Sequence, residues 1–172
     1  MRKKLRSAGG LTLVEMLCAV AILVLLCLMM NTGMQMAVKS YDRLTAESET
    51  QLLLGSLSDA LIDKLRYAVV TDTDTLSIGE VRLENGRIVV VEKSGTVKQL
   101  LPDGAYGTDR WEYDVELVKK EDGSEHQLYE YEDGKFTVHF KIVWTKDESV
   151  SAQTPEGGLV IHCLNPVRSE EP

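Results

Sequence analysis

Residues 9–17 read Gly-Gly-Leu-Thr-Leu-Val-Glu-Met-Leu and open a run of apolar residues that extends from Leu11 to Met30. A helix rises about 1.5 Å per residue, so a run of this length spans roughly 30 Å, the thickness of the hydrocarbon core of a bilayer. The clearly polar members of the run are Thr12 and Glu15. A charged side chain at that depth costs on the order of 2.5–3.5 kcal/mol on insertion scales, and we therefore interpret Glu15 as a functional residue.

The charges on either side of this run are distributed unevenly. Four bases and no acid precede it, at Arg2, Lys3, Lys4 and Arg6, and the rest of the 172-residue chain carries 15 bases and 27 acids. The positive-inside rule then predicts a single-pass membrane protein with a cytoplasmic N-terminus and an extracytoplasmic C-terminal domain. Nucleic acid is captured by Lys and Arg side chains that neutralise phosphates, so an acidic exported domain argues against nucleic acid as a partner.

Three other interpretations of the segment fit the residues less well. A secretory signal peptide has a shorter apolar core followed by a cleavage site with small residues, which residues 31–33 match weakly. A lipoprotein signal needs small residues before its acceptor cysteine, whereas Cys18 follows Glu-Met-Leu. A plain signal anchor explains the apolar run and the bases but gives no reason for Glu15.

A basic leader, a glycine and an apolar residue before Thr-Leu-Val-Glu-Met-Leu resemble the cleavage and methylation motif of type IV prepilins and pseudopilins. The resemblance implies that a prepilin peptidase cuts between Gly10 and Leu11 and methylates the new amine of Leu11. Glu15 then becomes the fifth residue of the mature chain and serves in assembly. The chain departs from the family pattern in having Leu11 where most relatives have Phe, and Thr32 where many major pilins have Pro.

The same resemblance implies a set of partners and a place of action. The partners are the prepilin peptidase, other pilin or pseudopilin subunits of a homo- or hetero-filament, the inner-membrane assembly platform and membrane lipid. The expected function is that of a subunit of a type IV pilus or of a type II secretion pseudopilus, in secretion, adhesion, motility or DNA uptake. The alternative is an exported binding protein with a single-pass membrane anchor that is never cleaved.

The chemistry expected of Glu15 follows from its distance to the cleavage site. Cleavage exposes a protonated amine at the edge of an apolar layer, and the Glu15 carboxylate lies about one helical turn away from it. Pairing these charges, within one subunit or between neighbours, would offset a desolvation that neither group could bear alone. In related pili the favoured partner is the amine of the adjacent subunit. The alternative is a protonated or snorkelling Glu15 without a role in assembly.

Beyond the apolar run the residues remain strong helix formers, and the chain has no proline before Pro102. We expect a leader over 1–10, a transmembrane half-helix over 11–33 and an amphipathic half-helix over 34–70, joined as one helix. An apolar stripe recurs at three- and four-residue spacing in the amphipathic half, at Leu54, Leu57, Leu61, Leu65 and Ala68. The opposite side is polar, with Glu47, Glu49, Ser56, Asp59, Asp63 and Lys64. We expect a sheet of the same chain to cover the stripe, in preference to a coiled-coil partner.

Residues 71–164 change to a period of two and predict an antiparallel β domain, followed by a tail over 165–172. Strands are predicted over 80–84, 87–92, 96–101, 111–117, 127–132, 135–145 and 158–164, with hairpin turns that include Asn85-Gly86 and Asp133-Gly134. Loops are predicted over 102–110 and 146–157. Consecutive hairpins favour a meander, so the expected fold class is α+β, a long N-terminal helix packed on an antiparallel β-meander as in pilins.

No motif in the β domain predicts catalysis, and we expect no enzyme activity, no cofactor and no metal site. The chain has three histidines, in no Ser-His-Asp order, and His139 alternates with apolar residues and is predicted on the outer face of its strand. Cys18 and Cys27 lie on roughly opposite faces of the predicted helix and cannot bridge within one chain. Cys163 is interpreted as a small buried hydrophobe, with an intermolecular disulfide or a reactive thiol as the alternatives.

Overall fold

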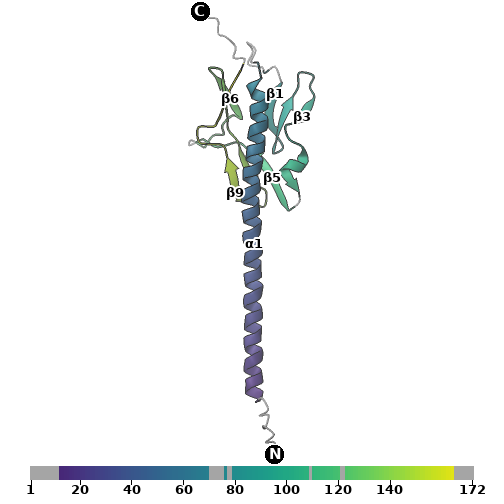
Figure 1. The fold of residues 1–172 in the computed structure, drawn as a ribbon, viewed down its shortest axis with the longest axis vertical. Coiled ribbons are helices and arrows are strands. Elements are labelled where there is room, and N and C mark those ends of the chain that lie inside the picture. Colours follow the sequence, from purple (N-terminus) through teal and green to yellow (C-terminus); the bar gives the residue numbers. More distant parts are fainter. Residues whose placement is uncertain (1–11, 70–75, 77–78, 109, 121–122, 165–172) are drawn as a thin grey trace, which may run out of the picture. The chain divides into compact units, whose positions relative to one another are not determined.

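The structure is a computed structural model that describes residues 12–69, 76, 79–108, 110–120 and 123–164. It has the α+β class expected, with one long helix, α1 (Leu13–Arg66), and antiparallel strands that follow it (Figure 1). The chain divides into two compact units, Met1–Asp42 and Arg43–Pro172, and the division falls within α1. Each unit is described by itself.

The described part of the first unit is the N-terminal part of α1. Every side chain from residue 12 to residue 41 is exposed, and the segment is apolar enough to cross a membrane. The helix continues through Thr32 and Gly33 without a break. The Thr32 hydroxyl donates to the carbonyl oxygen of Met29 at 3.0 Å, so this polar group is satisfied within its own helix.

In the second unit, α1 buries one face under the strands that follow it. The buried stripe consists of Ala46, Thr50, Leu53, Leu57, Leu61 and Leu65, and it continues at Ala68 beyond the helix. The cover is therefore supplied by the same chain, as expected. Two details differ from the prediction: Leu53, which was not in the predicted stripe, is buried while Leu54 is half-buried against the same core, and Glu49, predicted on the polar side, faces the β domain. A helix places residues three and four apart on one face, so Leu53 and Leu54 both fit the spacing between Thr50 and Leu57, and both contact the core.

The first sheet is a meander in the order β1-β2-β3, with β1 (Glu80–Glu84), β2 (Arg87–Val91) and β3 (Val97–Gln99). Its first hairpin is the one that Asn85-Gly86 predicts. Both turn residues have positive φ, 49° and 70°, as a type I′ turn requires.

A second sheet has the order β10-β7-β6, with β6 (Tyr129–Glu132), β7 (Lys135–Val138) and β10 (Leu159–His162). The predicted turn at Asp133-Gly134 joins β6 to β7, with φ values of 48° and 74°. Strand β10 returns along the other edge of β7 and brings the end of the described chain back beside this hairpin.

The third sheet has the order β4-β5-β8-β9, with β4 (Gly107–Thr108), β5 (Trp111–Glu116), β8 (Lys141–Trp144) and β9 (Asp147–Gln153). Because β5 pairs with β8 across the β6–β7 hairpin, the predicted simple meander was wrong. Two predicted loops also contain structure. The 3-10 helix η1 (Asp103–Tyr106) and β4 lie within 102–110, and β9 lies within 146–157.

The predicted strand 135–145 is two strands that belong to different sheets. The chain leaves the second sheet after β7 and enters the third at β8, and the break lies at His139 and Phe140. The predicted inward side is correct, since Phe136, Val138, Phe140, Ile142 and Trp144 are all buried. The prediction for His139 was wrong, because its side chain is only 6% exposed. A strand that bends between two sheets no longer keeps alternate residues on the solvent side.

The core of the second unit lies between α1 and the three sheets. Its largest fully buried side chains are aromatic and come from segments far apart in the chain: Tyr106, Tyr113, Phe136 and Phe140. The stripe of α1 belongs to the same cluster.

Candidate functional site

The residues predicted to carry function lie at the start of α1. Gly10 and Leu11, the predicted cleavage and methylation positions, lie outside the described residues. Glu15 is in the first helical turn, and its carboxylate is exposed.

Thr12 and Glu15 bond to each other's backbone in both directions. The Glu15 N–H donates to the Thr12 hydroxyl oxygen at 3.2 Å, and the Thr12 N–H donates to Glu15 Oε2 at 3.4 Å. This reciprocal pattern is a capping box, which satisfies two N–H groups that have no partner inside a helix. The Thr-x-x-Glu spacing is visible in the sequence, although the capping box was not predicted from it. Glu15 therefore has a local structural role in addition to its charge.

The position of the carboxylate also has an electrostatic consequence. A helix N-terminus carries the positive end of the helix dipole, which favours an anion in the first turn. An amine placed one residue before Thr12 would bring a full positive charge to the same end of the helix. The first turn can therefore hold a carboxylate beside an ammonium group, whether that group belongs to the same chain or to another copy.

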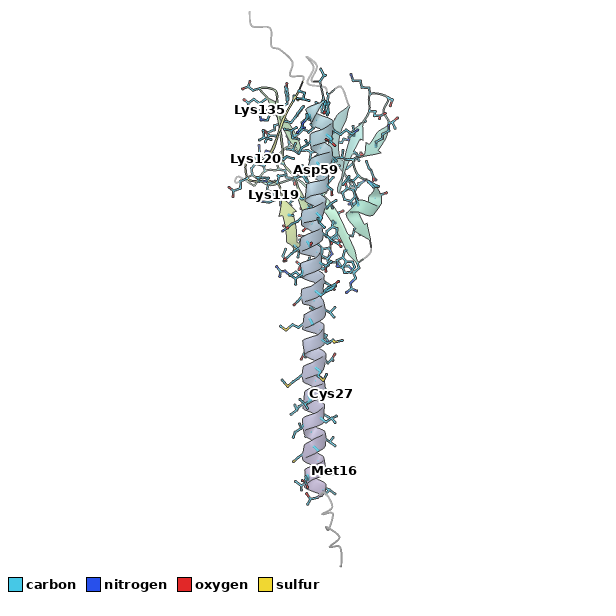
Figure 2. All side chains as sticks on the ribbon, in the orientation of Figure 1. Met16, Cys27, Asp59, Lys119, Lys120 and Lys135 are labelled. Carbon is cyan, nitrogen blue, oxygen red and sulfur yellow. The ribbon has the colours of Figure 1, made fainter. Side chains whose placement is uncertain are left out.

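From Met16 to Met30 the surface of α1 is apolar on every side. Large side chains that are at least 49% exposed include Leu17, Val20, Ile22, Leu23, Val24, Leu25, Leu26, Leu28, Met29 and Met30. Met16 and Cys27 lie on the same part of the helix, which is purple in Figure 2, and both are exposed. Soluble monomers rarely expose an apolar patch of this extent, so the surface requires lipid or other helices around it.

The other end of α1 is fastened by the end of β10 and the residues that follow. The Leu164 N–H donates to the carbonyl oxygen of Arg66 at 2.9 Å, and Cys163 Sγ donates to that of Leu65 at 3.6 Å. Cys163 is half-buried, and burial raises the pKa of its thiol. The thiol is therefore protonated at neutral pH and acts as a donor to the last turn of the helix, close to the expected role of a small buried residue.

A polar contact between α1 and β5 was not predicted from the sequence. The Tyr113 hydroxyl donates to Glu49 Oε2 at 2.7 Å, across 64 positions in the chain. Burial, followed by this hydrogen bond, raises the pKa of Tyr113 well above its usual value. The alternation of residues 111–117 correctly predicted that Tyr113 points inward, but no local signal in the sequence identifies Glu49 as the acceptor of its hydrogen bond.

Arg87 fastens the first hairpin to β5. Its guanidinium donates to Asp114 Oδ1 at 2.6 Å and to the carbonyl oxygen of Tyr113 at 3.0 Å, and it lies 4.3 Å from the ring centroid of Tyr106. The backbone completes the joint, since the Val115 N–H donates to the carbonyl oxygen of Gly86 at 3.0 Å. These contacts connect the first and third sheets and give Arg87 a structural role.

Within the residues that the structure describes, no group of three or more His, Cys, Asp or Glu side chains could hold a metal ion. A hollow of about 590 Å³ lies between β1 and β6 and is lined by both polar and apolar side chains, among them Arg82, Glu130 and Tyr131. No protein-family model, curated protein or solved structure matches the chain.

Proposed function

We propose that this chain is a type IV pilin-like or pseudopilin subunit. A prepilin peptidase cuts it between Gly10 and Leu11 and methylates Leu11, and the mature chain assembles through its N-terminal helix into a pilus or pseudopilus. The filament serves secretion, adhesion, motility or DNA uptake. The inner-membrane assembly platform and the other subunits of the filament are its partners.

The observation that carries this proposal is an apolar helix segment that is exposed along its whole length and has a single carboxylate, in its first turn. A membrane anchor needs the apolar surface but not the carboxylate, which is costly at that depth. A subunit that moves from lipid into a filament needs both the apolar surface and the carboxylate. The apolar surface then packs against neighbouring helices, and Glu15 pairs with the amine that cleavage exposes on an adjacent subunit.

The capping box favours a second candidate, the uncleaved membrane-anchored binding protein. If the function of Glu15 is to begin the helix, its charge has no role in assembly and the anchor needs no processing. A glutamine at this position still caps a helix in the same way, because its side-chain oxygen accepts the same hydrogen bond. Glu15→Gln therefore removes the charge and keeps the side-chain half of the capping box, whereas Glu15→Val removes both. The hydrogen bond from the backbone N–H of residue 15 to the Thr12 hydroxyl remains in each variant.

The two variants, expressed in a host with a complete pilus or pseudopilus machine, test the proposal. We expect both to be cleaved, and both to fall at least about tenfold below wild type in the sheared filament fraction, measured by quantitative immunoblot. Glu49→Gln, which changes a carboxylate of the same helix in the second unit, should assemble normally. Wild-type assembly by Glu15→Gln, with loss in Glu15→Val alone, would show that the cap matters and the charge does not.

A further inference from the structure

Two histidines from different segments stack where the chain passes from the second sheet to the third. The ring centroids of His126 and His139 are 4.1 Å apart, and their planes differ by 15°. His126 precedes β6, and His139 lies between β7 and β8. The His139 side chain is almost completely buried, and His126 is half-buried. Nδ1 of His126 is also buried and has no hydrogen-bond partner among the described residues.

The backbone around the pair connects the two sheets. The His139 N–H donates to the carbonyl oxygen of Leu128 at 2.9 Å, on the β6 side. The Thr154 N–H donates to the carbonyl oxygen of Phe140 at 3.0 Å, on the β9 side. The Phe140 N–H also donates to the Thr154 hydroxyl oxygen at 3.4 Å. One residue step thus separates the bonds to the second sheet from the bonds to the third.

Close packing leaves little room for the imidazole of His139 to move. A Cβ atom added at Gly158, which has a φ of 76°, would lie 2.7 Å from His139 Cε1. An imidazolium at this position could not turn toward water without displacing the segment that leads into β10. The free-energy cost of protonating His139 therefore destabilises the junction between the second and third sheets.

The charged groups around the pair are mainly basic. A hollow of about 440 Å³ is lined by His126, Lys119, Lys120, Lys141 and Glu156. Lys119 and Lys120, from the segment after β5, lie close together in Figure 2. Lys141, on β8, is bonded to Glu116 on β5 at 2.8 Å. Glu130, on β6, is the acid whose charge favours protonation of His139, and Lys120 opposes it.

We propose that the stacked pair is an acid-sensitive joint, which holds the second and third sheets together while His139 is neutral and weakens when His139 is protonated. The structure supports the direction of the effect. Burial, followed by the neighbouring His126, lowers the pKa of His139 below its usual 6.5. The unfolded chain then binds a proton before the folded chain does as the pH falls through 6.5. The stability that depends on neutral His139 is present above pH 6.5 and is lost progressively below it.

The thermal midpoint of the full chain in detergent micelles, measured at pH 7.5 and 5.5, tests this joint. Asp, Glu and Lys side chains with ordinary pKa values titrate little in that window, so histidine dominates the difference. We expect the midpoint of wild type to fall with acid by about 3 °C or more beyond that of His139→Phe. His162→Asn, which changes the exposed histidine of β10, should keep the wild-type fall. An equal fall in His139→Phe and wild type would overturn the proposal.

Amide exchange on the wild-type chain provides a second readout in case His139→Phe does not fold. After correction for the intrinsic pH dependence, the amides of His139, Phe140 and Thr154 should exchange faster at pH 5.5 than at pH 7.5. The amides of the β1–β2 hairpin, in the first sheet, should keep their protection and serve as the internal control. Unchanged protection at all three junction amides would equally overturn the proposal. Neither readout depends on processing or filament assembly.

Discussion

The two parts of α1 differ in whether their apolar side chains are exposed or buried. From residue 12 to residue 41 every side chain is exposed, although most of them are apolar, whereas between Arg43 and Arg66 one face is buried and the rest is largely polar. The second part buries its apolar stripe against strands of its own chain. The first part can satisfy its surface only with lipid or with other molecules, because a helix that is apolar on all sides is stable only when surrounded.

This difference explains how one helix can belong to the core of a folded domain and also present an apolar surface to lipid or to other molecules. The stripe from Ala46 to Leu65 makes the helix an integral part of the folded domain. The N-terminal part contributes no residue to that core. Changes in the first part should therefore leave the stability of the domain unchanged, while changes in the buried stripe of the second part should lower it.

The largest expected effect comes from truncating the buried stripe. Leu57→Ala removes a side chain with no exposed surface, and we expect the free energy of unfolding of the domain to fall by about 2–5 kcal/mol. Leu52→Ala, on the same helix but 68% exposed, should change it by about 0.5 kcal/mol or less. Urea unfolding followed by tryptophan fluorescence measures both, because Trp111 and Trp144 lie in the domain.

The control in the first part of the helix is Leu23→Ala. Leu23 is 61% exposed, so this variant should unfold at the same urea concentration as wild type in detergent micelles. A loss of stability as large as that of Leu57→Ala would show that the N-terminal part is packed into the domain, and the contrast between the two parts of the helix would fail.

A smaller effect is expected where α1 contacts β5 through polar atoms. Tyr113→Phe removes the hydrogen bond to Glu49 and should lower the free energy of unfolding by about 1–2 kcal/mol, with Tyr41→Phe as the exposed control. Because the pKa of Tyr113 is raised above 10.0, the unfolded chain loses this proton first in alkali. Stability is therefore kept below pH 10 and falls above it, and the fall should be shallower in Tyr113→Phe. Parallel pH profiles in the two proteins would contradict this account.

The smallest effect is expected at the first turn. Thr12→Val removes the hydroxyl that caps the helix, which costs about 1 kcal/mol, while Thr12→Ser should retain the cap. Faster amide exchange near Glu15, measured by mass spectrometry, would reveal the loss. The urea midpoint of the domain should not change. Wild-type exchange in Thr12→Val would mean that the capping box does not hold the turn.

The extent to which sequence alone predicted this fold depends on how local each signal was. Asn85-Gly86 and Asp133-Gly134 determine their turns within two residues, and both hairpins were predicted correctly. Strand β9 was missed because it contains one buried apolar residue, Val150, in an otherwise polar segment at the edge of its sheet. The break at His139 was missed because the inward alternation continues through it, and the change of partner strand leaves no mark in the alternation.

The candidate functional residues divide in the same way, into those with a local signal in the sequence and those defined by long-range contacts. The carboxylate at Glu15 and the apolar run were evident from composition, and the capping box was present as the spacing of Thr12 and Glu15, although it was not predicted. The contact of Tyr113 with Glu49 and the stack of His126 on His139 depend on which elements pack together. Such long-range pairs cannot be read from a local pattern.

We propose that the start of α1 is a processing and assembly site, and the mass of the chain after co-expression with a prepilin peptidase shows whether it is processed. We predict a mature chain that begins at Leu11 and carries one methyl group on its amine. Replacement of Gly10 by a bulky residue should abolish this product. A chain that keeps residues 1–10 in the presence of an active peptidase would contradict the claim and leave the uncleaved membrane anchor as the better account.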